Sequence, residues 1–297
     1  MSLLLFPVEI LRKQKRKREM TRAVKKTLAQ VVGDELATNP LGCWSWVLET
    51  RKRFEPRLFY DSHAANKSSF RRAVEITSNI LAYLEDEISV DGMCPGHGPG
   101  HWARDYINAC RLFSDPETVS RRMESEVLAG FAGGVLHDIG NTIVDRYHDS
   151  KTPVRHAEVG GLLLARMFER EGFGLSEPEQ LTILWAVMAH THYLKPQVME
   201  WNGESVTIEP YLDTDKKNSE PLWGVWFPRW IDRLDCSGSE TFIARHYLTL
   251  HEEHRDYGAE GFYDVKFRSH IQPRFLTPEE LKTAGGKQTM LGHLLMF

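Results

Sequence analysis

Apolar residues recur at helical spacing through the middle of this chain, and this periodicity is the feature that most constrains its fold. Side chains three and four positions apart share one face of a helix, so such segments predict amphipathic helices. The pattern runs through five segments, at 68–88, 102–113, 116–139, 157–170 and 178–192. Glycines at positions 140 and 172 are placed to end two of them. The sequence therefore predicts an all-α fold built from packed apolar stripes.

The regions that flank these segments have different sequence patterns. Residues 20–32 have helical spacing after a basic run, 33–62 look irregular and aromatic, and 229–237 and 241–251 predict two more helices. Two strand-like runs around Asn202-Gly203 predict a small β-hairpin insertion near 198–208. A loop rich in glycine and proline at 91–101 indicates a domain boundary. We therefore expect three parts: a mostly helical N-terminal extension (1–90), a main domain (91–260) and a mixed C-terminal extension (261–297).

Composition narrows the class of protein. The chain has 297 residues, with 37 Lys and Arg against 41 Asp and Glu. Its net charge of −4 argues against a nucleic-acid scaffold, which would be strongly basic. Its 4 cysteines are scattered without a CxxC pair, and the basic run follows the apolar start, the reverse of a secretory signal. No stretch approaches the roughly 20 apolar residues of a membrane span. We therefore expect a cytoplasmic protein without a membrane partner.

Histidine is unusually abundant, with 13 in the chain. Two of these histidines and two aspartates occur in a sequence order that suggests a metal site. His137 and Asp138 are adjacent where an apolar helix meets Gly140. His101 follows the glycine-rich loop, and Asp232 lies in an aromatic helix that continues to Asp235. An imidazole holds one cation and a carboxylate can bridge two, so this set favours a metal site.

The order His, His-Asp, Asp on successive helices resembles the HD superfamily of metal-dependent phosphohydrolases. The resemblance covers about half the chain and implies an HD-domain helical bundle. It makes His101, His137, Asp138 and Asp232 the metal ligands, with Asp235 as the competing candidate for the last position.

Two further positions match the family without being assigned to the metal. His97 stands four residues before the first ligand, where it would line the substrate pocket or hold the loop. Arg104 also matches a family position, and we expect its side chain to face outward.

A second metal depends on three more histidines. His156 begins a helix in the form His-x-x-x-Gly, as in the two-metal branches of the family, and the next helix ends near His190 and His192. The family form, an apolar helix ending in His-Thr, favours His190 over His192. We expect about two divalent ions per chain, bridged by Asp138. If His156 and His190 are packing residues instead, the other four ligands hold one ion.

The resemblance implies hydrolysis of a phosphomonoester or phosphodiester by a metal-activated water, and a nucleotide is the substrate that we expect. Asp138 would hold the nucleophile, and His97 and Lys195 are weak candidates for the general acid. Oxygen and nitrogen ligands without thiolate suit Mn, Fe, Mg, Ni or Co. The Gly-Tyr-Pro signature of cyclic di-nucleotide phosphodiesterases is absent after His192. Two alternatives stay open, which are a di-iron oxygenase on the same ligands and a nucleotide-binding regulatory module without turnover.

Overall fold

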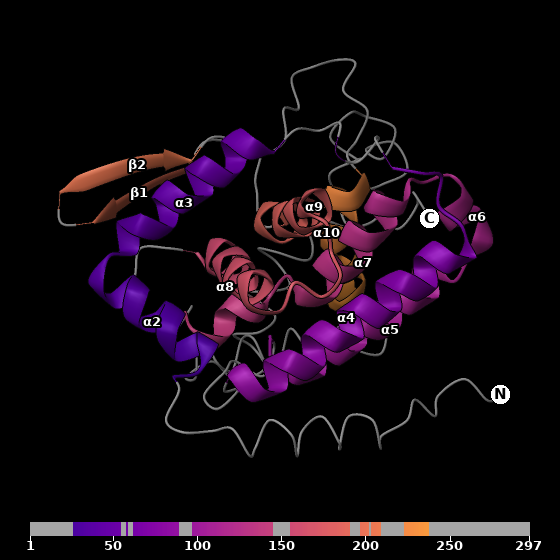
Figure 1. Ribbon diagram of the computed structural model, residues 1–297, viewed down its shortest axis with the longest axis horizontal. Helices are drawn as coiled ribbons and strands as arrows, with labels where there is room; N and C mark the ends of the chain where they lie inside the picture. Colours follow the sequence, from indigo (N-terminus) through magenta and orange to yellow (C-terminus); the bar gives the residue numbers. More distant parts are fainter. Residues whose placement is uncertain are drawn as a thin grey trace, which may run out of the picture.

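Helix α7 (Glu124–Leu136) lies at the centre of the molecule because almost its whole sequence is apolar or small. In this computed structural model it packs against α10 (Trp223–Ser237), α9 (Glu177–Ala189), α4 (Lys67–Glu87) and α5 (Pro99–Phe113), as Figure 1 shows. The structure describes residues 26–54, 58, 62–88, 97–144, 155–190, 197–201, 203–208 and 223–237. The predictions for 241–251, for the extension at 261–297, and for Lys195 and His192 lie outside these residues.

Glycines on α7 allow its neighbours to come close. A methyl group at Gly133 would lie 2.7 Å from the Cβ of Ala186 in α9, and one at Gly130 would lie 2.8 Å from the ring of Phe227 in α10. Larger side chains at these positions would push both helices away. The close packing fixes the ends of α9 and α10 relative to the end of α7.

The prediction of an irregular region at 33–62 was wrong for residues 33–53, which are almost entirely helical. Helix α2 (Leu28–Thr38) begins with a capping box at Thr27, and α3 (Pro40–Arg53) begins where the side chain of Asn39 accepts a hydrogen bond from the amide of Gly42. Both helices pack against α8 (His156–Glu171), with Trp44 fully buried, and form one edge of the molecule in Figure 1.

The predicted single helix at 116–139 was also wrong, because the chain breaks it into three. Helix α6 (Pro116–Ser120) is capped by Asp115, α7 follows, and the short 3-10 helix η2 (Ile139–Thr142) comes after α7. Between α6 and α7 the carbonyl of Arg122 accepts a hydrogen bond from Ala65, and the amide of Glu124 donates to His63. A distant segment thus takes over the backbone groups that a continuous helix would use.

The described residues are mostly helical, which confirms the all-α class at this coarse level. Strands β1 (Gln197–Trp201) and β2 (Glu204–Ile208) pair antiparallel with Trp201 opposite Glu204, and Gly203 has a φ of 82° in the turn. They lie at the periphery of the view in Figure 1. Within the described segments, no helix combines the length and apolarity needed to cross a bilayer.

Candidate metal centre

Six predicted ligands come together in the structure. Four of them lie in the first turn of a helix or just after a helix end, with Asp138 before η2 and Asp232 inside α10. His137 caps the end of α7, and Asp138 is the residue before η2. The remaining four come from four other helices and are His101 in α5, His156 at the start of α8, His190 just after α9 and Asp232 in α10. The structure therefore brings together one carboxylate-imidazole pair and ligands from four further elements.

The first group of ligand atoms surrounds the ring nitrogens of His101 and His137. Their Nε2 atoms are 3.3 Å apart, and Oδ1 of Asp232 lies 3.8 Å from each of them. Asp138 places Oδ2 at 3.4 Å from Nε2 of His101 and Oδ1 at 3.6 Å from Nε2 of His137. Ligands about 2.1 Å from one metal lie about 3.0–3.4 Å apart in octahedral or tetrahedral geometry. These spacings are therefore close to those of a metal site.

The second group lies on the other side of the same carboxylate. Nε2 of His156 is 3.2 Å from Nε2 of His190, and Oδ1 of Asp138 lies 3.3 Å from the first and 3.8 Å from the second. Asp138 is thus common to both groups, in the position of a bridging ligand.

The outer nitrogens of two imidazoles, His137 and His190, have backbone carbonyls as partners. Nδ1 of His137 donates to the carbonyl of Gly134 at 2.8 Å, and Nδ1 of His190 donates to the carbonyl of Val187 at 2.5 Å. A neutral imidazole with its proton on Nδ1 has its lone pair on Nε2. The Nε2 lone pairs therefore point at one another and at carboxylate oxygens, an arrangement that a central cation stabilises.

Asp235 and Arg104 have roles that the sequence did not predict. Oδ2 of Asp235 lies 2.8 Å from Nδ1 of His101, on the side of the ring away from His137. Arg104 faces this buried carboxylate and not outward, since its Nε donates to Oδ1 of Asp235 at 2.5 Å. Asp235 therefore meets His101 on Nδ1, whereas Asp232 lies on the Nε2 side, so Asp235 has the placement of an outer-sphere carboxylate.

His97 and Asp105 complete the polar surroundings. Nδ1 of His97, just before α5, lies 2.5 Å from Oδ2 of Asp138. Asp105 was not predicted as a site residue, but it is fully buried and its Oδ2 lies 3.0 Å from Nε2 of His101. Its spacing of four residues from His101, on the same face of α5, was the available signal.

Burial and mutual charge set the protonation of the cluster. Burial alone would raise the pKa of Asp138, but His137, His97 and the neighbouring imidazoles hold it well below its usual range. Burial, together with His137 and His156, pushes the pKa of His190 well below its usual value. A carboxylate that stays ionised and an imidazole that stays neutral are the forms that bind metal.

No family model, curated protein or solved structure matches this chain. Within the described residues, the buried His and Asp side chains form groups that could hold a metal ion.

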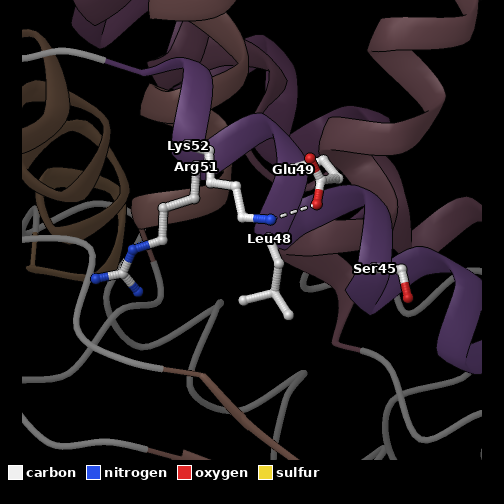
Figure 2. A pocket seen from close by; sticks show the side chains of 5 residues that line it. All are labelled: Ser45, Leu48, Glu49, Arg51 and Lys52. Atoms are coloured by element: carbon white, nitrogen blue, oxygen red, sulfur yellow. Dashed lines mark hydrogen bonds and ion pairs between the residues drawn. The ribbon is translucent and has the colours of Figure 1, made fainter.

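A separate hollow lies on α3 and includes none of these ligands. Figure 2 shows its lining side chains, and Nζ of Lys52 lies 2.6 Å from Glu49. Both side chains of this pair are more exposed than buried. The lining residues are Ser45, Leu48, Glu49, Arg51 and Lys52, all from one helix.

Proposed function

We propose that the chain is an HD-type metal-dependent phosphohydrolase that binds two divalent ions, with Mn, Fe, Mg, Ni and Co as the candidate metals. One observation carries the proposal. Nε2 lone pairs from both sides converge on Asp138, with their Nδ1 protons held by Gly134 and Val187. The order of these ligands along the chain resembles the order in the HD superfamily, which supports the same proposal.

The charge of the cluster suits an anionic substrate. Asp138 and Asp232 are the carboxylates among the six ligands, and the other four are imidazoles. Two carboxylates do not neutralise two dications, so an occupied site keeps net positive charge. When bound, such an ion pair supplies Lewis-acid chemistry to a phosphate ester and makes a water more acidic. A phosphomonoester or phosphodiester, such as a nucleotide, is the substrate class that fits.

Two residues of the chain have roles in this scheme. Asp138 holds ligands of both groups together through its two oxygens. His97 contacts Oδ2 of Asp138 and keeps some exposure, with 13% of its side chain accessible, so it is placed to move a proton between the centre and a substrate.

The test is a hydrolysis screen of the metal-loaded full chain. Nucleotides and a generic phosphodiester would be offered with Mn, Ni, Co, Fe and Mg in turn, after removal of all metals with a chelator. The proposal predicts metal-dependent release of phosphate or alcohol that His137→Ala removes. A chain that binds no divalent ion, or that hydrolyses equally well without one, would rule it out.

A further inference from the structure

Asp105 is a buried carboxylate that the proposed ligand set leaves unused. It lies one helical turn after His101 in α5, so both side chains emerge from the same face. Its Oδ2 lies 3.0 Å from Nε2 of His101 and 3.9 Å from Nδ1 of His137, and its relative exposure is 0%. Neither of its oxygens meets the geometry of a hydrogen bond with any described residue.

A buried carboxylate without hydrogen bonds is costly unless a cation compensates it. In the metal-free protein a proton on Nε2 of His101 supplies this charge, since the two groups lie at ion-pair distance. The form of His101 that binds metal has lost that proton, because its remaining proton is on Nδ1, facing Asp235, and its Nε2 lone pair then faces Asp105. Two electron-rich atoms at this distance repel each other unless a positive charge lies beside both. The separation of 3.0 Å also matches that of two ligands of one metal, about 3.0–3.4 Å.

We propose that Asp105 is an additional ligand of the metal ion held by His101 and His137. This inference rests on the proposed function, since it assumes that the centre binds metal. It gives the first group three carboxylates, from Asp105, Asp138 and Asp232, while the second group has only the shared Asp138. The first ion therefore binds more tightly than the second and prefers hard, oxygen-seeking cations.

The experiment compares Asp105→Asn with Asp235→Asn. Both variants remove one buried carboxylate beside the same imidazole, on opposite ring nitrogens, so the second is a matched control. The metal-free full-length proteins would be titrated with Co²⁺, with affinity measured by calorimetry and coordination by the visible absorption spectrum. Asp105→Asn should weaken the tighter site by more than about 100-fold and change its spectrum. Asp235→Asn should weaken it by about 10- to 100-fold, the usual effect of an outer-sphere change, and keep its spectrum.

The outcomes separate this inference from the proposed function. Wild-type protein that binds no Co²⁺ would overturn both. Wild-type protein that binds Co²⁺, with an Asp105→Asn variant of the same affinity and spectrum, would overturn the role of Asp105 alone. If Asp105→Asn does not fold, Asp105→Cys decides the matter. A new thiolate-to-cobalt absorption band, relative to wild type, would support ligation, and a folded, cobalt-loaded variant without the band would refute it.

Discussion

At the residue scale, Asp138 is the side chain on which the centre depends. It contacts imidazoles of both groups, and His137 beside it completes the first group. His137→Ala and Asp138→Ala should each abolish metal binding and hydrolysis together, because each removes a ligand. The remaining charged side chains then stay clustered without a cation, so stability should fall as well. Metal analysis by mass spectrometry checks this, and full metal occupancy in both variants would show that the site lies elsewhere.

His101 makes metal uptake depend on pH. Burial alone would lower its pKa, but Asp105 and the other carboxylates outweigh burial and raise the pKa well above the usual value. In the metal-free protein His101 therefore keeps its proton at a pH where an ordinary imidazole has lost it. That proton must leave before Nε2 binds a metal, so affinity should increase as pH rises through this raised pKa. Calorimetry at pH 7 in buffers of different ionisation enthalpy should detect proton release, and uptake without release would contradict the argument.

Gly140 sets how closely α8 approaches η2. A Cβ at this position would collide with the carbonyl oxygen of His156 and lie 2.6 Å from the amide nitrogen of Gly160. Gly140→Ala should therefore move His156 away from Asp138, cost about 1–3 kcal/mol of stability and remove one metal ion per chain.

The matched control is Gly33→Ala in α2, where the nearest atom to the new methyl would be 3.9 Å away. There alanine should stabilise the helix by up to about 1 kcal/mol and leave metal content unchanged. Thermal unfolding and metal analysis of both variants decide the matter. Equal metal content in Gly140→Ala and wild type would argue against this role of Gly140.

At the element scale, α9 shows how a helix can be weakened without touching the centre. Ser176 and Glu179 form a capping box at its start, while His190 follows its other end. Ser176→Ala should cost about 1 kcal/mol of unfolding free energy, since a cap is lost. Because the cap and the ligand lie at opposite ends of α9, metal stoichiometry should not change. Chemical denaturation and metal titration test the two halves of this prediction.

Elements could be predicted from the sequence where local signals are complete. The helix at 157–170 corresponds to α8, with apolar residues at helical spacing and Gly172, at a φ of 64°, after its end. The break at 121–123 could not be predicted, because it depends on hydrogen bonds to residues 63–65, far away in the sequence. The helical spacing predicted at 20–32 covers only the first residues of α2. Helix α3 was missed, although Asn39-Pro40 is a recognisable helix start.

The candidate site, too, could be predicted only in part. The spacing of His101, His137, Asp138 and Asp232 along the chain suggested one centre, and the structure places them within reach of one another. The place of Asp235 behind the ring of His101 could not be predicted, because it depends on how α5 and α10 cross. Asp105 lies in the same helix as His101, so its spacing of four residues was the one signal of their contact.

At the scale of the whole molecule, the centre ties together elements that are distant in the chain. Its candidate ligands come from α5, the α7–η2 junction, α8, the end of α9 and α10. A ligand that binds only the folded state stabilises it, by about 2.7 kcal/mol at 100 times its dissociation constant. Chelation should therefore lower the midpoint of thermal unfolding, and added Mn²⁺ should restore it. An unchanged midpoint would mean that metal contributes nothing to the fold.

The central claim is that Asp138 joins two metal sites, and the metal-to-chain ratio tests it most directly. Wild-type protein saturated with Mn²⁺ should hold about two ions per chain. The double variant His156→Ala, His190→Ala should keep about one and lose most turnover, because the second group is removed while the first stays intact. A wild-type ratio of one, together with full activity of the double variant, would contradict the account.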